Sequence, residues 1–279
     1  MKHYVRVAHR EYIAIAHQQI RFDDGLGYER YMGKWSRLVG GAFLDWLAPQ
    51  AGLRWLDVGC GNGAFTELII ERCAPASVHG IDPSEGQIAF ARARPGTQVA
   101  QFRLGDAMAQ PFADNTFDVA VMPLVIFFVP DPARGVAEMA RVVSPGGAVT
   151  AYSWDMIGGG FPYDALQSEM RAVGAAVGVP PSPGASRIDV ALELWAGAGL
   201  VDVEAREITV QRTFADFDDY WATILKGPSV GPGLAALTPD TLAILIERMR
   251  ARLPVDTDGH ITCRARANAI KGRVASAER

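Results

Sequence analysis

The spacing of hydrophobic positions changes about a fifth of the way along the chain. From residue 54 onward, short apolar runs alternate with longer segments in which apolar residues recur every three or four positions. The short runs predict strands and the longer segments predict helices. Strands that alternate with helices in this way are typical of a parallel sheet covered by helices.

The pattern places seven strands and several helices. Strands are predicted at 54–58, 78–81, 99–103, 117–122, 148–153, 201–210 and 261–270. Helices are predicted within 12–47 and at about 64–72, 84–94, 132–143, 164–177, 188–198 and 238–253. Helix starts are marked by Ser84 with Gln87 three residues on, by Asp131 before Pro132, and by Thr238 before Pro239.

Composition narrows the class of protein. The chain has 279 residues, of which 49% are hydrophobic and 21% charged, and this suits one large domain with small additions. Its formal net charge of −4 disfavours nucleic acid as the partner. Three cysteines, Cys60, Cys73 and Cys263, are too few and too scattered for a disulfide framework or a zinc site. A reduced, cytoplasmic location is therefore expected.

No membrane or export segment is expected. The apolar run 119–129 has 11 residues and is interrupted by Pro123, so it is about half of a membrane-spanning helix. Residues 1–20 lack the continuous apolar stretch of a signal peptide, and we interpret them as a frayed leader.

A glycine-rich segment follows the first predicted strand. Gly59, Gly61 and Gly63 occupy alternate positions there, where glycine permits positive φ and close approach of a ligand to the backbone. The next helix would point its free N–H groups at that ligand. Asp82, nineteen residues after Gly63, ends the second predicted strand, where a carboxylate can accept both hydroxyls of a ribose. The sequence therefore predicts a ribose-containing ligand at the carboxyl ends of the strands.

The glycine spacing bears on which nucleoside this is. The dinucleotide fingerprint is G-x-G-x-x-G, whereas this loop reads G-x-G-x-G with Asp57 two residues before the first glycine. An anion beside the loop disfavours a pyrophosphate and suits a ligand that carries an ammonium and a sulfonium. Two alternatives stay open at this point: Asp57 hydrogen-bonds only to loop amides, or the loop is a structural turn.

Five segments resemble one family. Residues 56–63, LDVGCGNG, are similar to motif I of class I S-adenosylmethionine (SAM)-dependent methyltransferases. The chain resembles later motifs of that family, in the same order, at residues 80–84, 105–107, 111–118 and 141–147. The likeness is greatest to the methyltransferase type 11 subgroup, which includes quinone-biosynthesis C-methyltransferases. Residues 28–37, 216–220 and 253–270 also resemble uncharacterised bacterial members.

The resemblance implies a fold. It implies a doubly wound α/β fold with a seven-stranded sheet in the order 3-2-1-4-5-7-6, strand 7 antiparallel, and a helical lid from about 12–47, 155–186 and 212–258. In domain terms, 1–47 would hold the leader and lid helices and 48–154 the SAM-binding core. Residues 155–279 would hold the lid insertions 155–186 and 212–258 and complete the core with 187–211 and 259–273.

The resemblance also implies a cofactor site for SAM and its product S-adenosylhomocysteine (SAH). The implied contacts are Trp35, Asp57, Gly59, Cys60, Gly61, Gly63, Asp82, Pro83, Ser84, Asp106, Ala107 and Met122. Asp57 and the glycines would hold the methionine end, Asp82 the ribose, and Asp106 the adenine amino group, with Ala107 nearby. Pro83 and Ser84 would flank the adenine ring.

Three of these positions carry qualifications. Met122, as the first residue after the fourth strand, would offer its carbonyl to the methionine ammonium. Asp106 has an alternative role as the N-cap of a short turn. The side chain of Cys60 is expected to be a small buried filler, because nothing basic nearby would make it a thiolate.

The acceptor site is less well specified. Its candidate residues are Tyr31, Arg37, Pro123, Phe127 and Trp154. Pro123 stands where the family often has a small or polar residue, and 123–129 is apolar, so a small, largely apolar acceptor is expected. Glycines at 158–160 and 227–233 are predicted to be flexible joints of the lid. The alternative is that the aromatic residues form a core of the lid itself.

Several readings compete over function. An NAD-dependent oxidoreductase would need the G-x-G-x-x-G spacing. A nucleic-acid methyltransferase is typically marked by Asn/Asp-Pro-Pro-aromatic after the fourth strand, where this chain has Met-Pro-Leu-Val at 122–125. A non-catalytic SAM-binding protein stays open. No His–Asp pair stands out as a general base, so the catalytic residues and the oligomeric state are not predicted.

Overall fold

The computed structural model describes residues 29–225, 227 and 230–276. The predicted leader over 1–20 lies outside the described residues. So do the part of the first predicted helix before residue 29 and residues 226, 228 and 229 around the second predicted joint.

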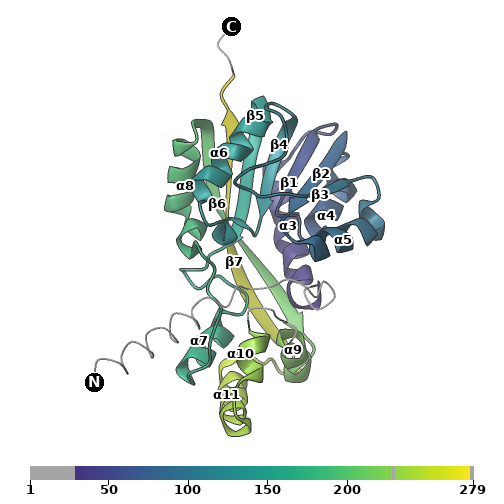
Figure 1. Cartoon of the computed structure of the whole chain (residues 1–279). Helices are drawn as coiled ribbons and strands as arrows, with labels where there is room; N and C mark the ends of the chain where they lie inside the picture. Colours follow the sequence, from purple (N-terminus) through teal and green to yellow (C-terminus); the bar gives the residue numbers. More distant parts are fainter. Residues whose placement is uncertain (1–28, 226, 228–229, 277–279) are drawn as a thin grey trace, which may run out of the picture.

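A seven-stranded sheet forms the centre of the molecule, in the order β3-β2-β1-β4-β5-β7-β6 (Figure 1). The strands are β1 (Arg54–Val58), β2 (Ser77–Asp82), β3 (Gln101–Leu104), β4 (Phe117–Pro123), β5 (Val143–Trp154), β6 (Leu200–Phe214) and β7 (Ile261–Val274). Strands β1 to β5 pair in parallel, and β7 runs antiparallel to both β5 and β6. The predicted order and the predicted antiparallel strand are confirmed.

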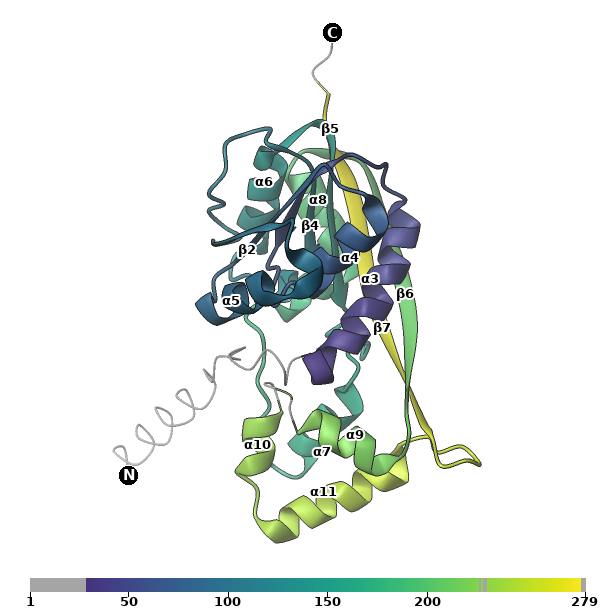
Figure 2. The same ribbon diagram turned by 90° about the vertical axis from the view of Figure 1, so that its right-hand side faces the viewer.

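The last two strands are longer than the sequence predicts, since β6 continues to Phe214 and β7 continues to Val274. β5 pairs with β7 only as far as Trp154↔Ala267, whereas β6 pairs with β7 out to Phe214↔Ile261. The pair therefore leaves the sheet as a two-stranded ribbon, which consists of residues 261–266 of β7 and 209–214 of β6. Because β7 is antiparallel, the ribbon projects from the edge where the parallel strands have their carboxyl ends (Figures 1 and 2).

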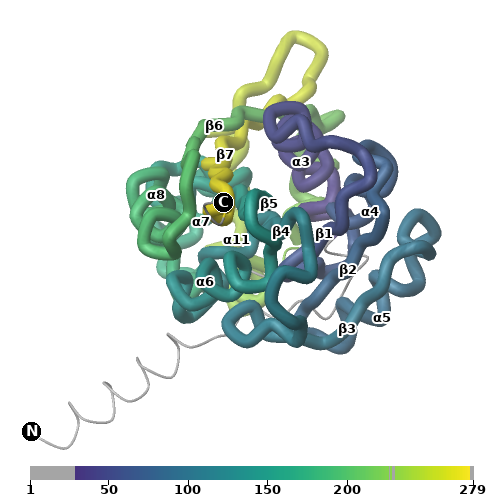
Figure 3. Tube along the Cα trace, turned by 90° about the horizontal axis from the view of Figure 1, so that it is seen from above, coloured from purple at the N-terminus to yellow at the C-terminus, as the bar shows by residue number. Residues whose placement is uncertain are grey.

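Helices cover both faces of the sheet. Those packed on it are α3 (Lys34–Leu47), α4 (Ala64–Cys73), α5 (Glu85–Ala93), α6 (Pro132–Val142) and α8 (Ile188–Gly197). Figure 3 shows α3 and α4 on one side of the sheet and α6 and α8 on the other. The predicted caps are present, since Ser84, Asp131 and Thr238 each accept a hydrogen bond from the amide three residues on. A π-helical turn, η1 (Glu29–Gly33), precedes α3.

The core divides along the pleat of the sheet. Trp55, Val119 and Tyr152 belong to the apolar cluster beneath α3 and α4, whereas Leu56 and Ala120 belong to the cluster beneath α6 and α8. Neighbouring residues of a strand face opposite sides. These strands are therefore buried on both faces, which explains why they read as apolar runs without alternation.

Four helices lie beyond the carboxyl edge of the sheet, around the ribbon (Figure 2). They are α7 (Asp164–Ala172), α9 (Phe217–Ile224), α10 (Gly231–Ala235) and α11 (Pro239–Arg252), here called the carboxyl-edge helices. They come from the two segments predicted as lid insertions. The helix predicted over 164–177 ends early, at Ala172, and Gly174 adopts a positive φ of 80° just after it.

The triple glycine at 158–160 corrects a prediction. Instead of a flexible joint it is a hydrogen-bonded turn: Gly158 N donates to Asp155 Oδ1 (2.7 Å), and Gly160 N donates to the Asp155 carbonyl (2.8 Å). Arg266 of β7 fastens the turn, since its Nη2 donates to Asp155 Oδ2 (2.5 Å) and its amide donates to the Gly160 carbonyl (2.9 Å). The glycines are needed for close packing, because a Cβ at Gly160 would lie 2.5 Å from the Arg266 carbonyl oxygen.

Candidate functional site

The loop between β1 and α4 consists of glycines in positive-φ conformations. Gly59, Gly61 and Gly63 have φ values of 75°, 51° and 81°. Their surroundings differ, because a Cβ on Gly59 would lie 2.5 Å from the Val125 side chain, whereas one on Gly61 would meet no atom within 4 Å. The loop is thus packed against the segment after β4 at one end and open at its middle.

The amides of this loop are largely used within the protein. Gly59 N and Cys60 N donate to the Ile81 carbonyl (2.8 and 2.9 Å). Gly61 N donates to Asp82 Oδ2 (3.0 Å), and Gly63 N donates to the Cys60 carbonyl (2.9 Å). A phosphate-binding loop directs free N–H groups at the anion. This loop is instead held in shape by its own hydrogen bonds.

Asp57 has a buried carboxylate with one oxygen unused. The residue is 0% exposed, and Thr66 Oγ1 donates to its Oδ2 at 2.6 Å. Its Oδ1 is buried and has no hydrogen-bond partner among the described residues. Burial raises the pKa of Asp57 to about 7; the hydrogen bond from Thr66 acts against this rise and the charge of Asp82 adds to it. A donor or a cation beside Oδ1 would relieve this unfavourable burial.

Asp82 lies at the end of the neighbouring strand β2. Its Oδ1 accepts from Ser84 N (2.9 Å) and its Oδ2 accepts from Gly61 N (3.0 Å). Burial raises its pKa, and these two backbone hydrogen bonds oppose the rise. Each carboxylate oxygen can accept a second hydrogen bond, so Asp82 keeps the capacity to bind hydroxyl donors.

The structure brings two further predicted segments to this edge. Gly105 N donates to the Asp82 carbonyl (3.2 Å), which places the turn at 105–107 beside the end of β2. In that turn Asp106 is exposed, and its Oδ1 accepts from Met108 N (2.8 Å), which is the N-cap role weighed above. Ser84 caps α5, and Pro83 before it is exposed.

Among the predicted cofactor residues, the position of Met122 needs correction, whereas Cys60 is the small buried filler that the sequence predicts. Met122 is part of β4, not the first residue after it, and its side chain is fully buried in the cluster beneath α6 and α8. The thiol of Cys60 packs with Ile88, Ala91 and Phe102, and burial raises its pKa well above the usual range. The side chains of Met122 and Cys60 therefore point into the core, and only their backbone atoms could contact a ligand.

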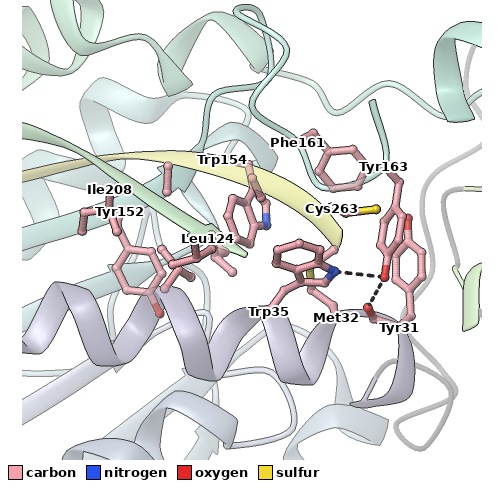
Figure 4. Close-up of a cluster of buried hydrophobic side chains, with 14 of the residues drawn as sticks. Tyr31, Met32, Trp35, Leu124, Tyr152, Trp154, Phe161, Tyr163, Ile208 and Cys263 are labelled. Atoms are coloured by element: carbon pink, nitrogen blue, oxygen red, sulfur yellow. Dashed lines mark hydrogen bonds between the residues drawn. The ribbon is translucent and has the colours of Figure 1, made fainter. Parts of the chain in front are cut away.

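A buried aromatic group lies between the end of β5, the start of α3 and the segment before α7 (Figure 4). Its five members are Tyr31, Trp35, Trp154, Phe161 and Tyr163. The rings of Tyr31 and Tyr163 stack with centroids 4.5 Å apart, and Trp35 meets Trp154 edge-on at 6.3 Å.

Hydrogen bonds inside the group fix its arrangement. Trp35 Nε1 donates to the Tyr163 hydroxyl (3.1 Å), which donates to the Tyr31 carbonyl (2.8 Å). Tyr31 and Trp154, both predicted acceptor residues, thus belong to the same aromatic group, and their role toward an acceptor stays a prediction. Trp35, predicted as a cofactor contact, instead packs among the other rings, which is the packing alternative. Trp154 Nε1 has no partner among the described residues.

The other predicted acceptor residues lie in two different environments, one buried and one exposed. Pro123 and Phe127 are buried at and just after the end of β4. Leu124 between them has a positive φ of 60°, a rare conformation for this residue type that no local sequence pattern predicts. Arg37 corrects a prediction, because its side chain is 39% exposed and pairs with Glu67 and Glu71 of α4, outside the aromatic group.

Sequence reasoning missed a polar network that reaches the glycine loop. Glu29 of η1 accepts from Asn62 Nδ2 (3.0 Å) and pairs with Arg94 (3.2 Å). Arg94 also pairs with Glu67 (2.8 Å), which Arg37 contacts at 3.1 Å. These partners lie far apart in sequence, so no local pattern could have revealed the network. It ties the segment that carries Tyr31 to the glycine loop.

Two features are absent from the described ranges 29–225, 227 and 230–276. No three His, Cys, Asp or Glu side chains are grouped there in a way that could hold a metal ion. In the same ranges, every helix is too short or too polar to cross a membrane.

Comparison with known proteins finds relatives of the segment that holds this site. Residues 56–151 match the family model described as a methyltransferase domain. The ubiquinone/menaquinone biosynthesis C-methyltransferase UbiE of Roseobacter denitrificans is 35% identical over 125 residues, which cover 43% of this chain and 50% of that protein. The demethylmenaquinone methyltransferase of Desulfitobacterium hafniense is 36% identical over 107 residues, 37% of this chain and 42% of that protein. The chain thus spans about half the length of these curated relatives.

Solved structures show the same fold. The YcgJ protein of Bacillus subtilis aligns with a TM-score of 0.57 at 17% identity, over 85% of this chain and 98% of that one. Phosphoethanolamine N-methyltransferase 2 of Haemonchus contortus, in complex with SAM, aligns with a TM-score of 0.58 at 18% identity, over 93% of this chain and 59% of that one. Residues 56–151, which hold the glycine loop and the two strand-end acids, therefore match a methyltransferase domain in sequence.

Proposed function

We propose that this chain transfers a methyl group from SAM to a small, largely apolar acceptor. The names of the curated relatives support a ring compound of the quinone type as the first acceptor to test. The matched segment is only part of those relatives, so the acceptor is argued from this chain's own residues.

The observation that carries the proposal is the unused oxygen of Asp57 beside a loop whose amides are occupied. SAM carries an ammonium, a sulfonium and a ribose diol, all of which suit carboxylate acceptors. A pyrophosphate would need the loop N–H groups, and it would meet the carboxylates of Asp57 and Asp82. The residues present therefore fit SAM better than a dinucleotide.

The chain's residues would divide the cofactor among them. Asp57 and the open middle of the loop at Gly61 would hold the methionine end, and Asp82 would accept the ribose hydroxyls. The turns at 83–84 and 105–107 would border the adenine. When bound, SAM supplies a methyl group already activated on a sulfonium.

The aromatic group would orient the acceptor and exclude water from it. Aligning a nucleophile with an activated methyl supplies much of the rate enhancement in such a displacement. Neither described histidine lies in the aromatic group: His79 packs on Phe112 and Phe117, and His260 lies in an exposed turn beside Asp256. The described part of the chain would therefore act by alignment and not through a histidine base.

Isothermal titration of the full chain with SAH and NAD tests the cofactor. We expect SAH to bind and NAD not to bind. Asp82→Ala should weaken SAH binding tens- to hundreds-fold, because hydrogen bonds to a charged group worth about 2–4 kcal/mol are lost. Glu85→Ala, an exposed acid three residues on, is the matched control and should bind SAH like the wild type. Equal affinity of Asp82→Ala and wild type would refute the assignment.

A second measurement separates catalysis from binding alone. Labelled SAM is incubated with the protein and with extracts of small molecules or nucleic acid. Label transfer to an organic-soluble small molecule supports the proposal. Transfer only to nucleic acid would favour that alternative, and SAH binding without any transfer would indicate a non-catalytic SAM-binding protein.

A further inference from the structure

Arg212 is a buried cation that forms no ion pair with any of the described residues. It lies on β6 in the ribbon beyond the sheet and is 8% exposed. Its Nη1 donates to the carbonyls of Arg30 and Tyr31, both at 3.3 Å, and its guanidinium lies 4.4 Å from the centre of the Phe214 ring. Its Nε is buried and has no partner among the described residues.

The groups around Arg212 do not neutralise it. The charge of Asp219 contributes to raising the pKa of Tyr163. Its carboxylate pairs with Arg30 (3.8 Å) and accepts a hydrogen bond from Ala215 N (3.2 Å). Within the described part of the chain, no carboxylate forms an ion pair with Arg212. Cys263 faces it on β7, and burial raises the pKa of that thiol to about 11 although Arg212 opposes the rise. Burial likewise raises the pKa of Tyr163, so both groups are neutral at pH 7.

A guanidinium in this setting is incomplete. Removing a charge from water is unfavourable unless it is paired, and two long hydrogen bonds to carbonyls leave the positive charge uncompensated. The edge of the guanidinium that carries Nε is the edge that a planar carboxylate commonly engages through two parallel hydrogen bonds. An anion at that edge would both satisfy Nε and balance the charge.

The position of Arg212 links it to the aromatic group. Its Nη1 donates to the same Tyr31 carbonyl that accepts the Tyr163 hydroxyl. Figure 4 shows Cys263, its partner across the ribbon, beside Tyr163 and Phe161. Arg212 therefore stands at the side of the aromatic group that lies on the ribbon, whereas Trp154 stands at the side on the sheet.

We propose that Arg212 binds a carboxylate of the methyl acceptor, whose apolar body lies against the aromatic group. The inference rests on the proposed function and narrows its substrate class to apolar carboxylic acids. One guanidinium supplies one positive charge, which matches a carboxylate better than a phosphate dianion. The proposed role of the carboxylate is recognition of the acceptor by Arg212.

A matched pair of probes tests the charge without knowledge of the true acceptor. 2-Naphthoate and 2-naphthamide share ring and size and differ in charge. Each is titrated into the full chain, with and without saturating SAH, by calorimetry and by saturation-transfer NMR. We expect 2-naphthoate to bind wild type at least tenfold more tightly than 2-naphthamide. 2-Naphthyl phosphate is a third probe and should bind more weakly than the carboxylate.

Variants assign the preference to the residue. Arg212→Met should abolish it, and Arg212→Lys should keep part of it because the charge remains. Arg264→Met is the matched control, since Arg264 is an exposed arginine on the same ribbon, and it should keep the full preference. The melting temperature and SAH affinity of each variant establish that it is folded.

The outcomes separate this inference from the proposed function. Four results would each overturn the role of Arg212. Wild type could bind 2-naphthoate and 2-naphthamide equally, bind neither of them, or bind 2-naphthyl phosphate more tightly than 2-naphthoate. The fourth is an unchanged preference for the carboxylate in Arg212→Met. Those results stand whether or not SAH binds, because the wild-type comparison needs no variant and is made on the same samples. Absence of SAH binding would instead overturn the proposed function.

Discussion

At the scale of one residue, the burial of the Asp57 carboxylate opposes the stability of the folded protein. Its carboxylate is fully buried, and only one oxygen is hydrogen-bonded, through Thr66. The pKa rises to about 7 because burial disfavours the charged form. Above that pH the ligand-free protein must hold an uncompensated anion, which a cationic ligand would pair with.

This predicts a pH dependence of stability with a definite sign. The folded-state pKa lies above the unfolded value, so Asp57 destabilises the folded protein progressively as pH rises from about 4 to about 7, and no further above. Asp57→Asn removes this effect. Its gain in unfolding free energy over wild type should be about 2–3 kcal/mol larger at pH 8 than at pH 5. Urea denaturation at both pH values, without ligand, measures the difference.

Asp258→Asn is the control for that experiment, because it removes an exposed carboxylate of the turn before β7. It should show no such change between the two pH values. The same Asp57→Asn protein should bind SAH more weakly than wild type at pH 8. A variant difference that is flat with pH would contradict the account of Asp57.

Two glycines of one loop should fail in different ways. Gly61→Ala is strained by its positive φ, by about 1 kcal/mol, but it meets no neighbour, so we expect a folded protein with SAH affinity at least tenfold lower. Gly59→Ala also strikes Val125 and should lose about 2–4 kcal/mol of stability. Val125→Ala should restore part of that loss when it is combined with Gly59→Ala, and none of the defect when it is combined with Gly61→Ala. Chemical denaturation and SAH titration of the two single glycine variants and the two double variants, compared with wild type, provide the test.

Single residues were predictable from sequence where their role depends on local order. The strand-end acids Asp57 and Asp82 follow from position after an apolar run, and both lie at the glycine loop. Arg37 and Arg212 have roles set by long-range packing. Arg37 turns to α4, whereas Arg212 lies beneath η1, and nothing in the neighbouring sequence distinguishes the two.

At the scale of elements, the network from η1 to α4 predicts unequal contributions from ion pairs. Arg94 is 17% exposed and bridges Glu29 and Glu67, so Arg94→Met would leave two acids close together in a half-buried site. We expect a loss of about 1–3 kcal/mol. Arg187 pairs with Asp189 on an open surface, so Arg187→Met should leave stability nearly unchanged. Denaturation of both variants at low and high salt makes the comparison.

Comparable losses from the two arginine variants would mean that the network is an ordinary surface feature. A larger loss from Arg94→Met that is accompanied by weaker SAH binding would show that Glu29 and Asn62 transmit the effect to the glycine loop.

Elements were predictable where the signal is local. The caps at Ser84, Asp131 and Thr238 each need only the side chain and an amide three residues on, and all three are present. β6 was predicted too short because its last residues, 211–214, lie in the ribbon and depend on pairing with β7. β7 was predicted too short because its last residues, 271–274, depend on pairing with β5 and β6 inside the sheet. The turn at 158–160 was misread as flexible because Arg266, its partner, lies more than 100 residues away.

At the scale of the whole molecule, the aromatic group joins parts that are distant in sequence. Trp154 comes from the end of β5, Trp35 from α3, and Tyr163 from the segment before α7. The carboxyl-edge helices belong to the same apolar cluster as these rings. The sheet order could be expected from the family resemblance, but the closeness of this packing could not, because it depends on how three separate segments fit together.

This packing predicts how the binding of SAH is felt beyond the glycine loop. Glu29 connects the loop residue Asn62 to η1, and the Tyr31 carbonyl of η1 connects to Tyr163 and Arg212. Ligand at the loop should therefore slow amide exchange in 29–47 and 155–186 as well as around Asp57 and Asp82, because local opening of these segments becomes less frequent.

Hydrogen exchange followed by mass spectrometry, with and without saturating SAH, measures this directly. Glu29→Gln is the informative variant, because it weakens the link between Arg94 and η1 while leaving the aromatic group and Asp82 unchanged in sequence. We expect it to retain protection around Asp57 and Asp82 and to lose much of the protection in 29–47. If wild type is protected only around the loop and Asp82, then the carboxyl-edge helices do not respond to the cofactor. The aromatic group would in that case be passive packing, and the argument for an enclosed apolar acceptor would lose its main physical support.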